Sequence, residues 1–458
     1  MSLSTCSILV SRQLGRTVGL SRPLAKALQV PTGKAIVLRV GSKDETVTVK
    51  TVARKDSVII LPLNLVRALR IPRLGSCLIK NNGGSSLQLG PIIGILTSTG
   101  KDTTAPFGTR TSFIREFIQT GSGKAFFIAF SPSQVNWQQS EVTGYTLDQT
   151  GKWVRKTVPL PDVVYNRLPS RKAEKQLSIN LFKERFIRRR IPLFNWSFFD
   201  KWDVYRLLDG DKDAERHVPE SYINPTPMDI RRMIEKHRFV YLKPTAGSLG
   251  IGIYRLTYNP NRGYFARYRR GGSNVLVRFS KFEGIMDLLR RHQIRLQNYV
   301  VQQGIRLLEL NGCPLDFRFH MTKNGNNQWV AAGIGAKVAG RGSVTTHIRT
   351  GGQILTPETA LSKVFGSQAK AEQILNQAKE TAVRLAEAIE RNYPYPLGEL
   401  GFDIGIDQNE KVWMFEANAK PGRSIYKHPS LKEQGKATLR NLFEHCLYLS
   451  RFRARREG

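Results

Sequence analysis

The sequence predicts a multidomain protein that mixes the α+β and α/β classes: a β-rich N-terminal module, a small parallel α/β domain and a larger C-terminal part. A chain of 458 residues is long enough for two or three domains. Short β patterns fill residues 1–90, whereas strand and helix patterns alternate over residues 91–200. Residues 201–458 contain a glycine-rich hairpin and an acidic hairpin, so the chemistry is expected there.

The first 90 residues are expected to form a small β-barrel or sandwich. Three segments rich in Val, Ile and Thr predict strands: Lys34–Val40, Glu45–Val52 and Ser57–Leu61. Asn81–Ser85 is a strong turn signal, and one helix is expected near Leu63–Leu69. Because this region holds no convergent catalytic set, we interpret it as an accessory or binding module.

Residues 91–200 predict a small parallel α/β domain. Strands and helices are expected to alternate over these segments: Pro91–Thr97, Phe113–Thr120, Ala125–Phe130, Val163–Arg167 and Ser178–Arg188. Open α/β sheets bind ligands at the carboxyl ends of their strands, which makes Asn166 and Arg167 candidates for ligand contact. Capping of the protein surface is the alternative interpretation of these two residues.

The charge of the chain is strongly positive. The 71 Lys and Arg residues against 36 Asp and Glu residues give a net charge of +35. This excess indicates an anionic partner, whether nucleic acid, an acidic polymer, anionic lipid or nucleotide phosphate. Positive charge is concentrated at Arg185–Arg190, at Arg262–Arg295 and in the tail Arg451–Arg456, although each cluster is equally compatible with solvated surface.

The cysteines and the N-terminus indicate a soluble cytoplasmic protein. The four cysteines are scattered, without the spacing of a zinc site or a disulfide framework: Cys6, Cys77, Cys313 and Cys446. The N-terminus lacks a sustained apolar region, and no segment approaches ~18 uninterrupted apolar residues, so membrane insertion is not expected.

Two apolar runs predict a β-hairpin near the C-terminus, Leu400–Ile406 and Lys411–Ala417. A polar turn, Asp-Gln-Asn-Glu, separates them. If Asp407 and Glu410 close that turn, Asp403 lies opposite Met414 and diagonal to Glu416.

Alternation along the two strands then assigns the faces of this hairpin. Asp403, Glu416 and Asn418 share one face, and the other face is an apolar core of Phe402, Ile404, Trp413 and Phe415. Three hard oxygen donors on one face suit Mg²⁺, which binds a few protein oxygens and completes its shell with water and phosphate. An ordinary amphipathic hairpin with a solvated acidic face is the alternative.

The segment Phe239–Leu256 predicts a strand, a glycine-rich loop and a second strand. Glycines let backbone N–H groups approach phosphate oxygens, and Lys243 adds a positive charge at the start of the loop. It is not a P-loop, because no Gly-Lys-Ser/Thr sequence follows, and a purely structural turn is equally compatible. The loop residues concerned are Gly247, Ser248, Gly250 and Gly252.

Two further strands follow. Asn298–Ile305 is a short β run that turns at Gly304, and Asp316, Arg318 and His320 then alternate onto one face of the next strand. An arginine that faces a metal-phosphate site would stabilise charge on a transferring phosphoryl group.

Taken in order, these elements resemble the ATP-grasp superfamily over roughly residues 160–430: Lys201, Lys243 with its glycine loop, Gln302-Gln303, Asp316-x-Arg318, and Asp403 with Glu416-x-Asn418. Within it, the chain resembles the YheC/YheD endospore-coat-associated family over most of its length. The matching phrases are Gly90–Thr97, Tyr165–Arg171, Phe199–Trp202, Tyr241–Pro244 with Gly247–Gly250, and Asp316–Arg318.

The resemblance implies a domain organisation. Residues 91–200 would be the α/β domain that precedes the ATP-grasp fold, and residues 201–305 a nucleotide-binding subdomain with a glycine-rich lid. Residues 306–458 would be the catalytic core, with the metal ligands and the basic tail.

The resemblance also implies roles in ATP binding. Lys201, which opens a helix over Lys201–Leu208, would reach the α-phosphate, and Lys243 would be the second nucleotide lysine. The loop Gly247–Gly252 would cover the β- and γ-phosphates. The interdomain hinge, Val300–Gln303 with Gln302 and Gln303, would bind adenine through its backbone. Ile305 would pack on the base, and Glu309 occupies the place of a ribose-binding acid.

For catalysis, the resemblance implies that Asp403, Glu416 and Asn418 are magnesium ligands that join the metal to the phosphates. It also implies that Arg318 is a catalytic arginine and that Lys243 shares in catalysis. The sequence departs from many carboxylate–amine ligases of the superfamily at one point. Lys337 and His347 occupy the region where those enzymes place an arginine and an asparagine. A lysine replaces the charge but not the two-pronged guanidinium geometry, so acceptor handling is open.

The implied activity is ATP-dependent activation of a carboxylate as an acylphosphate, followed by attack of an amine. The carboxylate and amine substrates are unknown, and an acidic peptide or polymer is a candidate. Two alternatives remain: a phosphotransferase acting on an anionic or polyol substrate, and a polyanion-binding coat or structural protein with a vestigial nucleotide site. The family also implies association with the spore coat in a sporulating cell.

Overall fold

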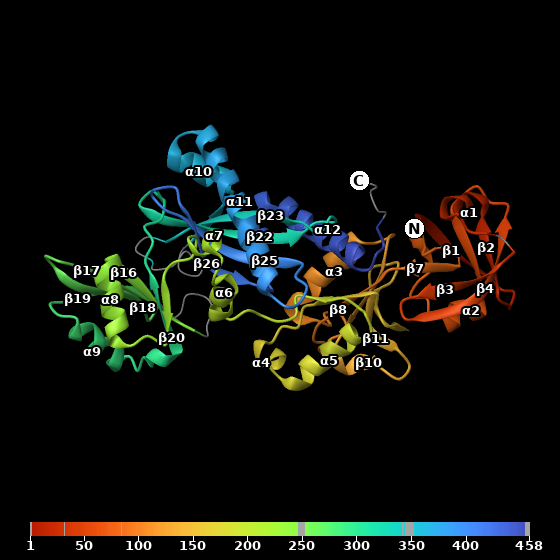
Figure 1. Cartoon of the computed structure of the whole chain (residues 1–458), viewed down its shortest axis with the longest axis horizontal. Helices are drawn as coiled ribbons and strands as arrows, with labels where there is room; N and C mark the ends of the chain where they lie inside the picture. Colours follow the sequence, from red (N-terminus) through yellow and green to blue (C-terminus); the bar gives the residue numbers. More distant parts are fainter. Residues whose placement is uncertain are drawn as a thin grey trace.

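The molecule is a row of four β-sheets, shown from one end to the other in Figure 1. The computed structural model describes residues 2–31, 33–83, 85–245, 252–340, 343 and 352–453, with the side chains of Lys201 and Trp202 outside the description. None of the helices in this described part is long and apolar enough to cross a membrane. The architecture is the multidomain α/β and α+β arrangement that the sequence predicts.

The first sheet is a closed barrel, with strand order β1-β5-β2-β4-β3-β7-β6. The two short helices α1 and α2 each follow a barrel strand. Helix α1 ends at the left-handed residue Gln29 (φ 52°), whereas α2 ends at Leu69 and the left-handed Arg70 (φ 50°) follows it. The sequence predicted α2 but missed α1. The elements are β1 Ser2–Ser11, β2 Thr17–Ser21, α1 Arg22–Leu28, β3 Ala35–Val40, β4 Lys43–Val52, β5 Val58–Pro62, α2 Leu63–Ala68, β6 Gly75–Asn81 and β7 Ser86–Gly90.

The second sheet has the order β10-β11-β9-β8-β13-β14, with β12 paired to β11. Strands β9, β8, β13 and β14 are parallel, as the sequence predicts, but the antiparallel extension β10–β12 was not anticipated. Its elements are β8 Ile92–Leu96, α3 Thr111–Thr120, β9 Phe126–Phe130, β10 Val135–Asn136, β11 Glu141–Leu147, β12 Trp153–Pro159, β13 Val163–Asn166, α4 Arg171–Glu174, α5 Leu177–Arg188 and β14 Leu193–Phe194.

The barrel and the second sheet share one hydrophobic core. A single buried cluster runs from barrel residues such as Leu38 and Ile79 to Ile128 and Phe130 of β9. At the edge of this contact, Glu141 accepts ion pairs from the barrel residues Lys43 (2.6 Å) and Arg70 (3.2 Å). The N-terminal module is therefore packed onto its neighbour instead of being tethered to it.

The third sheet lies at the opposite end of the molecule, with order β15-β20-β16-β17-β18-β19. Residues from α8 and α9 pack on one of its faces in a separate buried cluster. Its elements are β15 Ser221–Ile223, α8 Pro227–His237, β16 Phe239–Pro244, β17 Tyr254–Asn259, β18 Gly263–Arg270, β19 Ser273–Phe279, α9 Glu283–Arg291 and β20 Tyr299–Gln303.

The fourth sheet, β24-β23-β22-β25-β26 with β21 beside β22, lies between the second and third. The long helix α11 covers its apolar face, which leaves the opposite face for polar residues, and α12 packs against β22, β23 and α3. The elements are α6 Lys201–Leu208, α7 Lys212–Glu215, β21 Glu309–Leu310, β22 Cys313–Lys323, β23 Trp329–Val338, β24 Gln353–Leu355, α10 Pro357–Phe365, α11 Gln368–Asn392, β25 Glu399–Ile406, β26 Val412–Asn418 and α12 Lys432–Leu449.

Candidate active site

The acidic hairpin β25–β26 forms, but its register differs from the prediction. Asp403 lies directly opposite Glu416, not opposite Met414. The turn closes between Asp407 and Lys411: the backbone N–H of Asp407 donates to the Lys411 carbonyl (3.0 Å), and the Asp407 carboxylate accepts from the Lys411 N–H (2.9 Å). This longer turn, followed by a bulge after Asp403, moves the pairing to Glu416.

The longer turn and the bulge together change which aromatic residues face the site. Phe402 and Ile404 are buried in the core as predicted, and Met414 joins them. The prediction was wrong for Trp413 and Phe415, which lie outside that core cluster. Trp413 is paired with Gly405 and donates Nε1–H to Asp407 Oδ2 (2.9 Å). The Phe415 ring lies so close to Gly405 that an added Cβ would be 2.5 Å from it.

Asp403 stands in a network of charges drawn from three strands. Its carboxylate contacts Arg318 of β22 (Nε to Oδ1, 3.2 Å) and Lys337 of β23 (Nζ to Oδ1, 3.1 Å). Lys337 also pairs with Asp316 at 2.8 Å. Burial opposes ionisation of Asp403, but the charges of Arg318 and Lys337 outweigh it and hold its pKa below the ordinary value. Lys337 thus supplies a cation that the sequence left without a role.

Lys243 reaches the same space from the third sheet. Its Nζ donates to Gln302 Oε1 (2.5 Å) and lies 5.8 Å from the ring centroid of Phe415 on the fourth sheet. Gln302 Nε2 in turn donates to the hydroxyl of Tyr205 on α6 (2.5 Å). Burial raises the Tyr205 pKa, with a contribution from the negative charge of Glu416. The lysine, the glutamine and the acidic hairpin therefore face one another between the two sheets.

The predicted hinge, Val300–Gln303, lies within β20. Gln303 accepts from the backbone N–H of Glu220 (3.1 Å), so its side chain fastens β20 to the segment before β15. Gly304 lies against Phe239, where an added Cβ would meet the ring at 2.1 Å. Ile305 is half-buried, whereas Glu309 is exposed and lies in β21 opposite Pro314.

Several predicted site residues lie outside the described residues: Gly247, Ser248, Gly250 and His347, together with the side chain of Lys201. The backbone of Lys201 opens α6 as expected. Gly252 is described, with φ 75°, and an added Cβ would lie 3.3 Å from the Tyr299 hydroxyl. This left-handed conformation is one that glycine adopts readily.

The donor set on the hairpin fits a magnesium ion that is held partly by substrate. Across the described part of the chain there is no group of three or more His, Cys, Asp and Glu residues placed to hold a metal. Asp403, Glu416 and Asn418 offer two carboxylates and one amide on one face. Mg²⁺ commonly takes one or two carboxylates and completes its shell with phosphate and water, so this small set suffices only with a nucleotide present.

A second polar cluster lies where the second and fourth sheets meet. Arg167, at the end of β13, pairs with Glu399 of β25 (2.7 Å), and Glu399 also accepts from His320 (3.0 Å) and from Tyr165. Asn166 is fully buried and donates to Glu174 (2.7 Å). Surface capping is therefore the wrong interpretation of both residues, because each side chain binds another residue in the interior of the protein.

Sequence reasoning named Arg167 but missed Arg423, which shares the Phe113 ring with it, and the neighbouring Arg110. The guanidinium carbons of Arg167 and Arg423 lie 5.0 and 5.3 Å from the ring centroid of Phe113. Arg423 NH1 is buried without a hydrogen-bond partner within the described structure. Arg110 donates to Thr97 and Ser98 at the end of β8. Such a cluster cannot be found from spacing, because its members come from distant parts of the chain.

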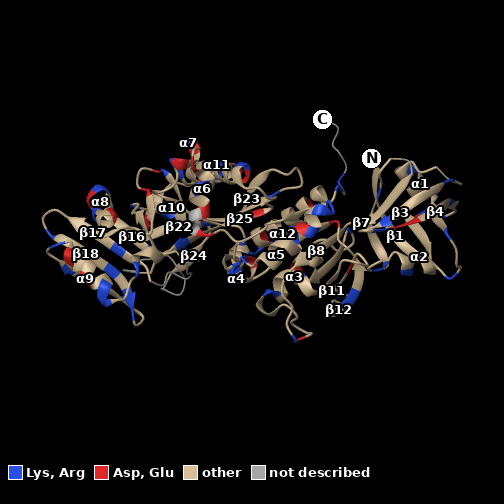
Figure 2. Ribbon diagram, turned by 60° about the horizontal axis from the view of Figure 1, so that its bottom comes forward, with Lys and Arg blue, Asp and Glu red and all other residues tan. Residues whose placement is uncertain are grey.

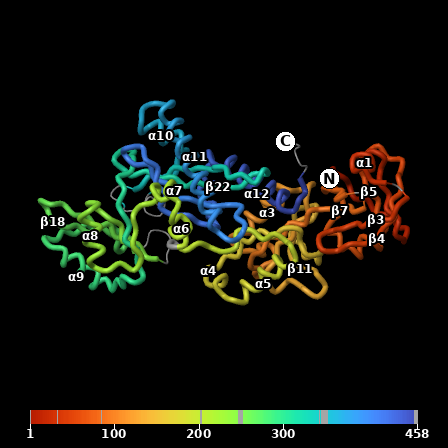
Figure 3. The backbone as a smooth tube through the Cα atoms, in the orientation of Figure 1, coloured from red at the N-terminus to blue at the C-terminus, as the bar shows by residue number. Residues whose placement is uncertain are grey.

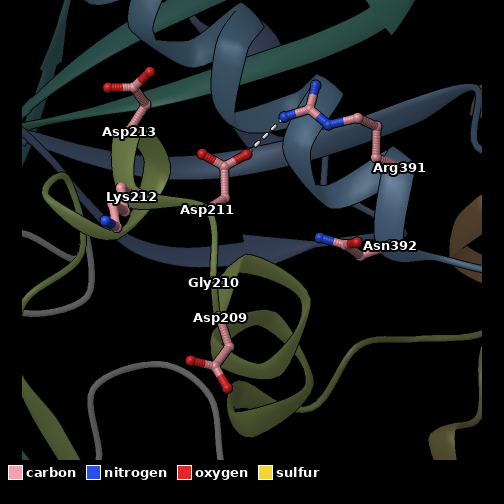
Figure 4. Close-up of a pocket in the computed structure, with 7 residues that line it drawn as sticks. All are labelled: Asp209, Gly210, Asp211, Lys212, Asp213, Arg391 and Asn392. Carbon is pink, nitrogen blue, oxygen red and sulfur yellow. Dashed lines mark hydrogen bonds and ion pairs between the residues drawn. The ribbon is translucent and has the colours of Figure 1, made fainter.

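One further hollow lies apart from these residues, between the ends of α6, α7 and α11 (Figure 4). Three of its polar side chains already have partners within the protein: Asp211, Arg391 and Asn392. Asp211 accepts from Arg391 (2.6 Å) and from the backbone of Ala214, and Asn392 donates to the Leu207 carbonyl (2.7 Å). We assign it no ligand.

Comparison with known proteins identifies the family. The family described as YheC/D like ATP-grasp matches residues 190–449, more than half of the chain. The chain belongs to this family. The endospore coat-associated protein YheD of Bacillus subtilis (strain 168) is 34% identical over 403 residues, which cover 86% of each chain. YheC of the same organism is 24% identical over 322 residues, 67% of this chain and 84% of YheC.

Solved ATP-grasp structures resemble this YheC/D-like chain more distantly. The D-alanine-D-alanine ligase from Coxiella burnetii is 12% identical, with a TM-score of 0.42, over 79% of this chain and 96% of that one. The ATP-grasp ligase PsnB, complexed with a minimal precursor, is 14% identical with a TM-score of 0.41, over 78% of this chain and 99% of that one.

Proposed function

We propose that this protein is an ATP- and Mg²⁺-dependent ligase that activates a carboxylate as an acylphosphate and joins it to an amine. One observation carries the proposal. Lys243 of the third sheet and the Arg318–Asp403 pair of the fourth converge on the face that also holds Glu416 and Asn418. Such an arrangement supplies cations and metal ligands to a triphosphate.

Nucleotide binding is distributed over both sheets in this proposal. Lys201 and Lys243 neutralise phosphate charge, and the loop Gly247–Gly252 closes over the phosphates. The hinge Gln302–Gln303 binds adenine, with Ile305 against the base and Glu309 near the ribose. Asp403, Glu416 and Asn418 would hold magnesium, which when bound draws charge from the β- and γ-phosphates.

The chemical step needs positioning and charge neutralisation more than an acid or base. A substrate carboxylate oxygen bonds to the γ-phosphorus while the bond to the bridging oxygen breaks, and ADP leaves with that electron pair. Arg318 stabilises the transferring phosphoryl group. An amine nitrogen then bonds to the acyl carbon, inorganic phosphate leaves, and the nitrogen loses a proton.

The arginines at the meeting of the second and fourth sheets favour an anionic substrate. Arg167 and Arg423 lie over Phe113, and Arg110 binds Thr97 and Ser98 just after β8. Open α/β sheets bind ligands at the carboxyl ends of their parallel strands. Arg167 already pairs with Glu399, whereas Arg423 retains a buried donor group without a partner in the described structure. We assign these residues to the substrate carboxylate.

A coat protein with a vestigial site is the second candidate, and one observation favours it. Asp403 is already neutralised by Arg318 and Lys337, so this carboxylate is stable without a metal. The relatives named as endospore coat-associated support a location at the spore coat under either proposal.

The deciding experiment measures ADP and phosphate release from Mg·ATP across a library of amino acids, acidic peptides and polyols. A ligase releases both products only when a carboxylate and an amine are present together. A phosphotransferase releases ADP with a polyol and no free phosphate. No product with any acceptor, despite ATP binding, would favour the vestigial site.

A further inference from the structure

The face of the third sheet that α8 and α9 leave uncovered is cationic. The covered face holds Tyr254, Leu256 and Ala266 in the buried cluster. On the other face, Arg255 of β17 lies opposite Tyr241 on one side and Arg267 of β18 on the other. Directly opposite residues share a face, so the two arginines stand side by side next to the proposed nucleotide strand. We call this surface the arginine face.

Arg278 extends the arginine face to the edge strand. It lies opposite Phe265, which in turn lies opposite Thr257 on the same side of the sheet. Arg278 is exposed, and its Nε donates to the backbone carbonyl of Arg262 (2.8 Å). Figure 2 shows the blue segments around α9 and its neighbouring strands.

The strands of the third sheet carry no carboxylate of their own. In residues 239–303 the only carboxylates are Glu283 and Asp287, both on α9 behind the opposite face. Within the described structure, Arg255, Arg267 and Arg278 form no ion pair with a carboxylate. Arg255 stacks 4.4 Å over the Phe239 ring, and its buried Nε has no hydrogen-bond partner. A buried donor without a partner indicates that an outside acceptor completes the site.

The arginine face is too wide to be explained by ATP alone. Neighbouring strands lie about 4.8 Å apart, so Arg267 is about 10 Å and Arg278 about 14 Å from β16 across the sheet. Lys243 and Gln302, on β16 and β20, already mark the nucleotide strands. The distant arginines therefore face a second anion.

We infer that the arginine face binds an acidic peptide, the chain whose carboxylate is activated at the proposed site. The inference rests on the proposed function and names its substrate class. The arginine face continues to Tyr241. Burial raises the pKa of Tyr241, and the charges of Arg255, Arg267 and Asp316 also act on it, so the face borders the strand that carries Asp316 and Arg318. A peptide rich in Glu or Asp supplies both the anions for docking and the carboxylate for reaction. A nucleic acid supplies only the anions.

The test compares two double variants that lose the same charge. Arg267→Gln with Arg278→Gln removes two cations from the arginine face, and Arg290→Gln with Arg291→Gln removes two exposed cations from α9. Fluorescently labelled poly-L-glutamate is titrated at low and physiological salt, with and without Mg·ATP. The first variant should weaken binding about tenfold, since each exposed ion pair contributes on the order of a few-fold. The α9 variant should stay within about twofold.

Three outcomes would overturn the inference: equal losses in both variants, no binding of poly-L-glutamate by the unmodified protein at low salt, or complete displacement by Mg·ATP. The inference would also be overturned, in favour of nucleic acid, if a labelled single-stranded DNA bound more tightly than poly-L-glutamate and the Arg267→Gln/Arg278→Gln variant lost that binding. Thermal stabilisation by Mg·ATP is measured in every sample. If it persists while peptide binding fails, the arginine face is wrongly assigned but the proposed nucleotide site stands. A folded protein without that stabilisation has lost the nucleotide site itself.

Discussion

At the scale of single residues, the two hairpin carboxylates are not equivalent. Asp403 is held between Arg318 and Lys337, whereas Glu416 makes no ion pair or hydrogen bond through its side chain in the described structure. A cation that enters this face must share Asp403 with two existing partners, but it meets Glu416 without competition. Metal binding should therefore depend most strongly on Glu416.

Replacing Glu416 with Gln should remove most of the thermal stabilisation by Mg·ATP. The amide keeps the size of the side chain but not its charge, so the metal and the γ-phosphate lose a ligand. Unmodified protein at about a hundredfold excess of ligand over Kd should gain about 2.7 kcal/mol. The shift in melting temperature with and without Mg·ATP checks this. Glu433→Gln, an exposed change on α12, is the control, and an unchanged shift in Glu416→Gln would remove the residue from the metal site.

Arg318→Lys should lower the rate of ADP formation about 10²- to 10³-fold, while ATP affinity changes only a few-fold. Lysine keeps the charge but cannot contact two oxygens at once, and loss of one oriented donor to a transferring group typically has this effect. Single-turnover ADP release with the carboxylate identified in the library, beside an ATP titration, checks both quantities. A rate near that of the unmodified protein would mean that Arg318 only supports Asp403.

At the scale of elements, the hairpin shows what sequence reasoning reaches. Alternation correctly placed Asp403, Glu416 and Asn418 on one face. It could not find the bulge near Phe415, because a bulge depends on how the turn closes and on what packs beneath the strand. Trp413 and Phe415 were therefore assigned to the wrong side, whereas Phe402 was placed correctly. The contact between Phe415 and Lys243 joins two sheets and leaves no pattern in either segment.

Gly405→Ala should destabilise the protein by about 1–3 kcal/mol, because the added Cβ would lie 2.5 Å from both Leu307 and the Phe415 ring. The same displacement of Phe415 should weaken Mg·ATP binding. Gly422→Ala is the matched control, since nothing lies within 4 Å of its added Cβ. Chemical denaturation of both variants checks the difference, and equal stabilities would show that Phe415 moves aside freely.

The contact between the second and fourth sheets should weaken in acid. Burial lowers the pKa of His320 from 6.5 to about 4, and the charge of Arg167 overcomes burial to lower that of Glu399 from 4.5 to about 2. Between pH 6.5 and 4 the unfolded histidine gains a proton that the folded one does not, so stability falls as pH falls. Glu399 continues the loss below pH 4.5.

His320→Gln should therefore flatten the stability profile between pH 6.5 and 4. The variant should lose about 2–3 kcal/mol less unfolding free energy over this range than the unmodified protein, since each pKa unit corresponds to about 1.4 kcal/mol. Denaturant midpoints measured across this range check it. A variant that lost stability as steeply as the unmodified protein would place the acid sensitivity at another group.

At the scale of the whole molecule, the C-terminal segment contacts the N-terminal barrel. Figure 3 shows the C-terminal helix α12 beside α3 of the second sheet. Lys80 of the barrel donates to the carbonyls of Ser450 (3.1 Å) and Arg451 (3.2 Å), at the end of α12. The sequence predicted the β-rich module and the parallel strands from local patterns. It gave no sign of this closure, because a contact between residues 370 positions apart depends on the complete fold.

Phe452 packs at the contact between the C-terminal segment and the barrel, far from the proposed catalytic site. Its loss should therefore lower the stability of the protein without changing that site. The ring is fully buried, with Lys80 Nζ 4.2 Å from its centroid. Phe452→Ala should lower the free energy of unfolding by about 3–5 kcal/mol and lower the melting temperature. The added stabilisation by Mg·ATP should remain, because the buried cluster that contains Phe452 includes no residue of the hairpin β25–β26 among the described residues. Calorimetry with and without Mg·ATP checks both. Tyr448→Ala, at a ring that is 42% exposed, should change little. Loss of the Mg·ATP effect in Phe452→Ala alone would mean that the closure also positions the active site.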